Sequence, residues 1–154
     1  MLKKLTLAFV LLLNVSCFAN TLQIGQKILP FELRNQHGKM VKVDDKAKII
    51  LFTKEKAPSN LLNRFLLKQN GDFLSKNHAY FIADISAMPF LISKMIAIPQ
   101  LKKMSHEILL VKKETTLSFV PHKKGFITVI KKKDGKIQAI SFVNTMTAIE
   151  KIFK

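Results

Sequence analysis

The residues with the clearest chemical potential in this sequence are polar side chains that follow two apolar segments. Asp84 stands near the end of the apolar stretch 79–85, and a loop rich in lysine follows the apolar stretch 48–53. Because open α/β sheets bind ligands at the carboxyl ends of their strands, we expect both loops to meet at one edge and to form a small polar pocket. The candidate ligand or partner edge consists of Lys54, Lys56, Asp84 and Ser86, with Ser59 and Asn60 near them.

The same side chains allow a purely structural interpretation, in which Asp84 pairs with a lysine and Ser86 caps the next helix. A mixture of acid, lysine, serine and amide is also compatible with hydrolysis. No candidate base, however, has a sequence spacing from a nucleophilic side chain that would indicate a catalytic pair. We therefore predict no catalytic residue, and the edge is a candidate binding site.

Support for a metal site is weak. The four histidines are too scattered for any two to have metal-ligand spacing, and we expect surface or turn positions for His37, His78, His106 and His122. Met88, Met95 and Met104 could serve as thioether ligands for copper. Because Met88 and Met95 fall on one face of an expected helix, core packing is favoured. We predict neither a metal nor another cofactor.

The amino terminus has the three-part pattern of a secretory signal peptide. Lys3 and Lys4 precede the apolar run 5–13, and small residues at 17 and 19 fit cleavage after Ala19. The apolar run is too short to cross a bilayer as a helix, which takes roughly 20 residues. The sequence therefore predicts a signal peptide at residues 1–19, followed by a single domain at residues 20–154 that is exported to the periplasm.

Cys17 is the only cysteine of the sequence, and it lies inside the predicted signal peptide. A lipoprotein signal would place a large aliphatic residue three positions before the cysteine, where this chain has Asn14. Lipid attachment through Cys17 is thus the less favoured alternative. Cleavage would remove the thiol and acylation would block it, so the mature domain is expected to have neither a free thiol nor a disulfide.

Positive charge is the strongest compositional signal. The expected mature domain has 24 basic and 10 acidic residues, a net charge of about +14, and only Arg34 and Arg64 are not lysines. Nucleic acid is not expected as a partner of an exported protein, and base-specific recognition depends on arginine more than on lysine. The scattered lysines fit a solvated surface. The functional alternative is attraction to anionic envelope surfaces such as lipid head groups.

Short apolar segments that alternate with amphipathic ones predict an α/β fold. The expected strands span residues 31–33, 40–43, 48–53, 79–85, 107–111, 126–130 and 136–142. Expected helices begin at Pro58, at a cap formed by Ser86 and at a cap formed by Asn144. The second helix carries apolar residues between Met88 and Ile96 and should end or kink at Pro99. Alternating strands and helices imply a parallel centre, with a hairpin at each end of the chain.

This order of elements resembles that of the thioredoxin superfamily, and two local motifs agree with it. Gly25, Phe31-Glu32-Leu33 and Gly38-Lys39 are similar to the opening G-x-x-x-P-x-F-x-L-x-D-x-x-G-K of peroxiredoxins and periplasmic thiol-disulfide proteins, although Leu29 and Asn35 replace its proline and aspartate. Residues 126–137 (FITVIKKKDGKI) resemble the late P-T-x-F-x-I-D-x-D-G-x-I hairpin. The resemblance covers residue 22 to the carboxyl terminus. It implies a thioredoxin-like fold with an N-terminal β-hairpin, a central β-α-β-α-β unit, a C-terminal β-hairpin and a closing helix.

The resemblance also locates the positions where the redox families carry their cysteines, which here read Ala57-Pro58-Ser59-Asn60. Ala57 and Asn60 stand in the places of the two thioredoxin cysteines, and Asn60 in the place of the peroxiredoxin cysteine. Thiol chemistry needs a thiolate, which neither residue can form. The Ser59 hydroxyl lacks the two-electron redox cycle. Phe126 occupies the place of the thioredoxin cis-proline, so both halves of the redox site are degenerate.

A narrower resemblance, through Asp-Ile-Ser-x-Met-Pro at Asp84 to Pro89, is to small, exported, cysteine-free thioredoxin-like proteins of Gram-negative bacteria. Some members carry flavin-dehydrogenase-type names, but this sequence has no Gly-x-Gly-x-x-Gly after a strand. We favour a non-catalytic binding or accessory protein of the cell envelope, whose partner is an unknown envelope protein or small ligand. Two alternatives stay open: an oxidoreductase-type enzyme that relies on a bound cofactor, and a basic protein that binds anionic lipid through its lysines.

Overall fold

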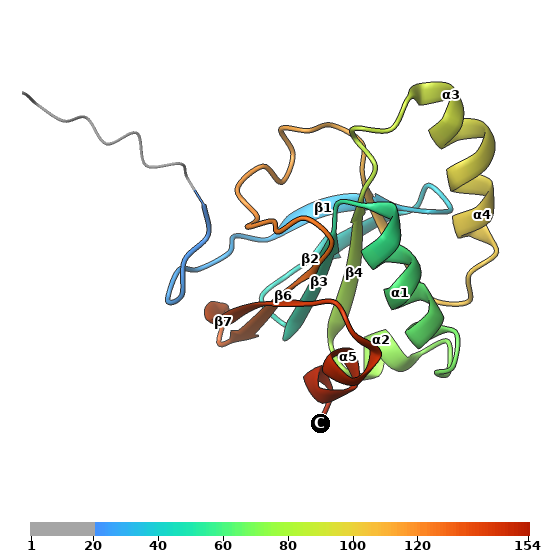
Figure 1. Cartoon of the computed structure of the whole chain (residues 1–154). Helices are drawn as coiled ribbons and strands as arrows, with labels where there is room; N and C mark the ends of the chain where they lie inside the picture. The colour runs from blue at the N-terminus through green and yellow to red at the C-terminus, as the bar shows by residue number, and fades with distance from the viewer. Residues whose placement is uncertain (1–20) are drawn as a thin grey trace, which may run out of the picture.

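A seven-stranded mixed sheet forms the centre of the protein (Figure 1). The computed structural model describes residues 21–154, so the predicted signal peptide and its cysteine lie outside the described residues. The strands are β1 (Phe31–Asn35), β2 (Met40–Val43), β3 (Ile49–Thr53), β4 (Ala79–Asp84), β5 (Leu109–Val111), β6 (Ile127–Lys133) and β7 (Lys136–Val143). Their order across the sheet is β2-β1-β5-β4-β3-β6-β7. Strands β3, β4 and β5 are parallel, and the two terminal hairpins flank them antiparallel. The predicted α/β class and element order are confirmed.

The central strand β3 has apolar side chains on both faces, as its continuous apolar sequence predicts. Leu51 packs on the face that carries α1 (Lys56–Leu66) and α5 (Met146–Ile152), where Leu62 and Ile149 are also fully buried. Ile50 and Phe52 pack on the opposite face. That face is covered by segments without helices, the chain before β1 and the loop between β5 and β6.

Helix α1 is held by an apolar face that includes Leu62, Phe65 and Leu66, all buried. Phe65 stacks on Phe153 with 5.8 Å between ring centroids. It also forms a T-shaped contact with Phe73, and these ring centroids are 5.8 Å apart as well. Phe73 opens the short helix α2 (Phe73–Lys76), after the predicted interruption. The predicted start at Pro58 is two residues late. A proline fits the third helical position because the first-turn N–H groups have no intrahelical partners.

The second helical segment, residues 90–102, differs from the predicted helix because it contains a π-helical turn and because it continues past Pro99. It consists of α3 (Phe90–Ile92), the π-helical turn η1 (Ser93–Ala97) and α4 (Ile98–Lys102). Of the two outcomes predicted at Pro99, an end or a kink, the end does not occur. Proline has no N–H for a helical hydrogen bond, and here the preceding turn widens while the helix continues.

The predicted core face of segment 90–102 is wrong, because none of its residues is buried. Phe90 and Met95 are each 71% exposed, and Leu91 is 65% exposed. The segment rests on the core through Ile98 and Leu101, which are only partly buried. No helix within residues 21–154 has the length and apolar content needed to cross a membrane.

The β6–β7 hairpin turns through the predicted Asp-Gly pair. Asp134 and Gly135 have φ angles of 53° and 75°, the left-handed values that a two-residue hairpin turn requires. The closing helix begins one residue later than predicted. Its cap is Thr145 rather than Asn144, because the Thr145 hydroxyl accepts the N–H of Ala148 at 3.2 Å.

Candidate functional site

A cavity of about 380 Å³ opens at the carboxyl ends of β3 and β4, between α1 and segment 90–102. Its volume lies in the range of small-molecule sites, roughly 300–1,000 Å³. The polar part of its wall includes five of the side chains that the sequence places at this edge: Lys54, Lys56, Ser59, Asn60 and Asp84. The apolar part is formed mainly by Met88, Ile92, Ile96 and Leu101. We refer to this space as the edge cavity.

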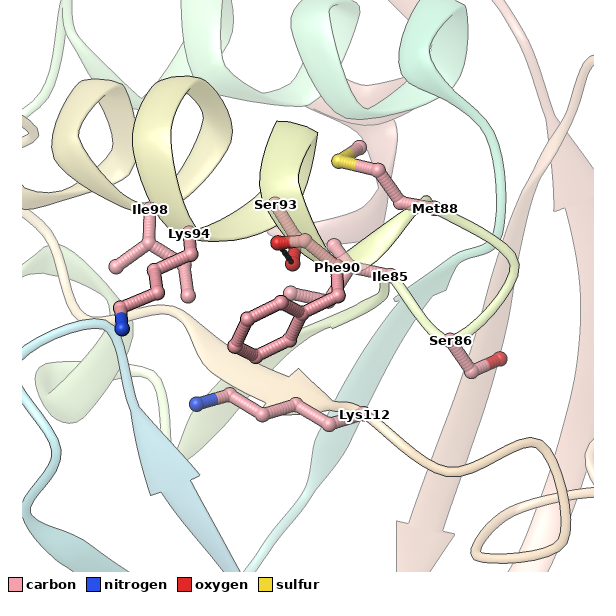
Figure 2. Close-up of a pocket in the computed structure, with 8 residues that line it drawn as sticks. All are labelled: Ile85, Ser86, Met88, Phe90, Ser93, Lys94, Ile98 and Lys112. Carbon is pink, nitrogen blue, oxygen red and sulfur yellow. Dashed lines mark hydrogen bonds between the residues drawn. The ribbon is translucent and has the colours of Figure 1, made fainter.

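Ser86, the sixth of these side chains, lies elsewhere. It lines a second cavity, of about 500 Å³, together with Phe90 and Lys112 (Figure 2). The Ser86 hydroxyl oxygen is buried and has no hydrogen-bond partner among the described residues. The predicted cap is wrong, since segment 90–102 begins after Pro89, which has no side-chain acceptor.

The Asp84 carboxylate is half-buried at the rim of the edge cavity. Its Oδ1 accepts the backbone N–H of Ser86 at 2.9 Å. Among residues 21–154 it forms no ion pair. The alternative in which Asp84 pairs with a lysine is therefore not observed. The remaining acceptor capacity of Asp84 is available to a ligand.

The Ser59 hydroxyl is fixed by the strand that precedes it. Ser59 Oγ and Thr53 Oγ1 are 2.6 Å apart and share a hydrogen bond. Thr53 is a buried residue at the end of β3, so Ser59 is tied to the sheet edge. A hydroxyl paired with another hydroxyl has no base to activate it as a nucleophile.

The degenerate redox positions lie on the first turns of α1 and near the start of β6. Ala57 and Asn60 are exposed, whereas Pro58, which lies between them in the sequence, is buried. Of these three, only Asn60 lines the edge cavity. Phe126 does not reach it; the ammonium group of Lys123 lies 4.1 Å from the centroid of its ring.

Glu55 is a site residue that the sequence interpretation missed. It precedes α1, and its Oε2 accepts the backbone N–H of Gly125 at 2.6 Å while Oε1 lies 3.4 Å from His122 Nε2. These contacts tie the β3–α1 loop to the loop before β6. The available signal was the isolation of Glu55 between Lys54 and Lys56, in a stretch of lysines with no other acid nearby.

His106 lies in the loop before β5 and is buried, so of the predicted surface or turn positions the surface position is wrong. Its Nε2 lies 2.8 Å from Oδ1 of Asn63, a buried residue of α1 that also reaches the wall of the edge cavity. Burial lowers the pKa of His106 to about 4, so the ring is neutral at pH 7. The pair joins α1 to the loop before β5 and stiffens one wall of the cavity.

The side chains at this edge are suited to binding a ligand. The described residues contain no thiol, and Ser59 has no activating base. Among residues 21–154 there is also no cluster of three His, Cys, Asp or Glu side chains that could hold a metal ion. Ammonium, carboxylate and amide groups face an apolar wall, an arrangement suited to a ligand with both ionic and apolar parts.

No protein-family model and no curated protein matches this sequence. Solved structures do match the fold. A thioredoxin domain of a thiol-disulfide oxidoreductase from Bacteroides vulgatus is 15% identical, with a TM-score of 0.53 over 87% of this chain and 100% of that chain. A peroxidoxin from Mycobacterium tuberculosis is 13% identical, with a TM-score of 0.53 over 84% of this chain and 92% of that chain.

StoA from Bacillus subtilis is 10% identical, with a TM-score of 0.54 over 84% of this chain and 100% of that chain. At such identities the similarity concerns the fold alone. The chain has the thioredoxin-like fold.

Proposed function

We propose that this protein is a non-catalytic binding or accessory protein of the cell envelope. Its edge cavity would hold a small ligand or a short segment of a partner protein. The observation that carries this proposal is the edge cavity itself, which joins a charged rim to an apolar wall and is lined by Asn60, a position that the resemblance equates with a redox cysteine. The envelope location rests on the signal-peptide pattern of residues 1–19.

The composition of the wall suggests how a ligand is recognised. Lys54 and Lys56 provide ammonium groups for an anionic group, and Asp84 provides a carboxylate for a donor. Ile92 and Ile96 provide apolar surface on the opposite side. Because the cavity is open to solvent, we expect a ligand to gain affinity only when it contacts both the charged groups and the apolar wall.

Native mass spectrometry of the protein isolated from its producing cells tests this proposal. Asn60→Trp would place a large ring at the cavity wall, whereas Asn70→Trp places the same ring at an exposed position beyond α1. We expect a bound mass in the wild-type protein and in Asn70→Trp, and its loss in Asn60→Trp. A bare wild-type monomer that ignores extracts of the envelope would contradict the proposal.

An absorption spectrum of the same preparation separates binding from cofactor-dependent catalysis. A colourless protein with a bound mass supports the binding protein. A flavin band in the visible range would instead favour the oxidoreductase-type alternative.

A further inference from the structure

The outer surface of segment 90–102 is apolar, although it faces solvent. Phe90, Leu91, Ile92, Met95 and Ile96 are between 47% and 71% exposed. Together they are named the exposed apolar face. A helix on the surface of a globular protein normally has polar residues outward. Five large apolar residues exposed within one short segment indicate an interaction site.

The exposed apolar face is not simply the back of a well-packed helix. The segment rests on the core through Ile98 and Leu101 and has the edge cavity on one side and the second cavity on the other. In Figure 2 the Phe90 ring projects beside Lys94 and Lys112 rather than into the core. Leu91 and Met95 line neither cavity, whereas Phe90 borders the second cavity and Ile92 and Ile96 border the edge cavity.

The charged residues of segment 90–102 and of the turn after it are all lysines, whereas the acids Glu55 and Asp84 line the edge cavity. No acidic residue occurs between Ile85 and His106 in the sequence, whereas Lys94, Lys102 and Lys103 lie on or directly after the segment. The Lys94 ammonium lies 5.5 Å from the centroid of the Phe90 ring, so charge and apolar surface are adjacent. The exposed Lys112 borders the same cavity as Phe90.

We propose that the exposed apolar face docks on the surface of an anionic lipid bilayer. The apolar side chains would enter the boundary between head groups and acyl chains, and the neighbouring lysines would contact head-group phosphates, as in other interfacial helices. This inference goes beyond the proposed function, because it concerns a different partner and a surface that shares only Ile92 and Ile96 with the edge cavity. It differs from attraction by scattered lysines in that a single face determines the orientation.

A second copy of this chain fits the same face less well. Two copies that met through this face would bring the lysines of both segments together, and each whole chain carries a formal charge of +16. Like charges placed opposite each other at an interface are unfavourable. An anionic surface satisfies both the apolar and the charged features.

Co-sedimentation with vesicles tests the docking. The protein and its variants are isolated from their producing cells, and the amino terminus of each is determined to verify that all have been processed alike. Vesicles of equal parts phosphatidylglycerol and phosphatidylcholine are compared with vesicles of phosphatidylcholine alone. The variant Leu91→Gln/Met95→Gln changes outward side chains that line neither cavity, and Leu29→Gln/Leu67→Gln changes two exposed apolar residues elsewhere.

We expect Leu91→Gln/Met95→Gln to lower the partition coefficient on anionic vesicles about tenfold, because less apolar surface enters the interface. Lys102→Gln/Lys103→Gln should lower it by at least about tenfold, since each lysine near an anionic surface contributes. Leu29→Gln/Leu67→Gln should leave it unchanged, and Lys131→Gln/Lys133→Gln, which removes the same charge from β6, should lower it by less than about threefold.

A tryptophan probe gives an independent reading, because the chain has no tryptophan. The emission of Met95→Trp should shift to shorter wavelength on anionic vesicles, and that of Leu67→Trp should not. Equal losses in helix and control variants, equal binding to both vesicle types, or no binding would overturn the inference. So would a lipid-free dimer that Leu91→Gln/Met95→Gln disrupts. Because Leu91 and Met95 line neither cavity, ligand retention by the edge cavity is scored separately.

Discussion

Helix α1 and segment 90–102 occupy equivalent places in the fold, but their apolar residues have opposite fates. Each follows a parallel strand, α1 after β3 and segment 90–102 after β4. In α1, residues such as Leu62 and Phe65 are buried against the sheet and α5. In segment 90–102 the largest apolar side chains, Phe90 and Met95, face solvent. The apolar side chains of α1 therefore stabilise the fold, whereas the exposed ones of segment 90–102 are accessible to a binding partner.

The two helices also differ in how their ends are fixed. Before α1, Glu55 contacts the loop that precedes β6, and within α1 the Asn63 side chain reaches the His106 ring. Neither helix has a side-chain cap, but among residues 21–154 segment 90–102 forms no side-chain hydrogen bond to another element. The edge cavity therefore has one rigid wall, formed by α1, and one wall with fewer restraints.

The largest effect is expected from truncating the apolar face of α1. Phe65→Ala should lower the free energy of unfolding by about 3–5 kcal/mol, because it leaves a cavity among Phe73, Phe153 and the sheet. Urea denaturation followed by circular dichroism measures this loss. A loss below about 1 kcal/mol would mean that α1 contributes no more than a surface helix.

The buried His106 should make stability depend on pH. Its pKa falls from an ordinary value of 6.5 to about 4 in the folded protein because burial disfavours the charged ring. The unfolded chain therefore binds the proton first as pH falls. Stability is complete above pH 6.5 and declines on going to about pH 4, by roughly 2–3 kcal/mol.

Urea unfolding of the wild-type protein and of His106→Gln across this pH window measures that decline. The variant should lose most of the slope between pH 6.5 and 4. His37→Gln, at an exposed turn position, is the matched control and should keep it. Identical slopes for all three proteins would show that the ring is protonated normally in the fold.

A smaller effect is expected at the start of α1. Glu55→Gln keeps an oxygen for the Gly125 N–H but loses the charge that strengthens this bond and the contact with His122. Because the side chain is partly exposed, we expect a loss of about 0.5–1 kcal/mol in unfolding free energy. Glu32→Gln, on an exposed strand position, should change little. An effect no larger than that of Glu32→Gln would remove Glu55 from the restraints on α1.

The smallest effect is expected on the exposed apolar face. Leu91→Ala should change the unfolding free energy by no more than about 0.5 kcal/mol, since an exposed side chain makes few contacts to lose. Equilibrium unfolding in urea again provides the measurement. A loss above about 2 kcal/mol would show that this face is packed in solution, and the contrast with α1 would disappear.

The sequence predicts the elements whose signals are local. The apolar runs of β3 and β4 and the Asp134-Gly135 turn were sufficient for the strands, the hairpin and the thioredoxin-like order. Helix starts were displaced by one or two residues, at Pro58 and at Asn144, because neighbouring residues can perform the same role. These differences leave the architecture unchanged.

Three features were missed because they depend on distant parts of the chain. Glu55 acts through Gly125, 70 residues away, and His106 is buried against Asn63 and Phe81. Periodicity identified the apolar residues of segment 90–102, but it does not tell whether another element covers them. The edge cavity brings together five residues of the predicted set, whereas Ser86 turns to the second cavity.

Amide hydrogen exchange tests most directly whether the edge cavity holds a ligand. The protein as isolated is compared with the same protein after unfolding in urea, dialysis and refolding, which removes a bound molecule. We predict that residues 54–60 and 84–88, on both sides of the cavity, exchange faster after removal, while β6 and β7 do not change. Identical exchange at both segments before and after stripping would contradict a ligand in this cavity.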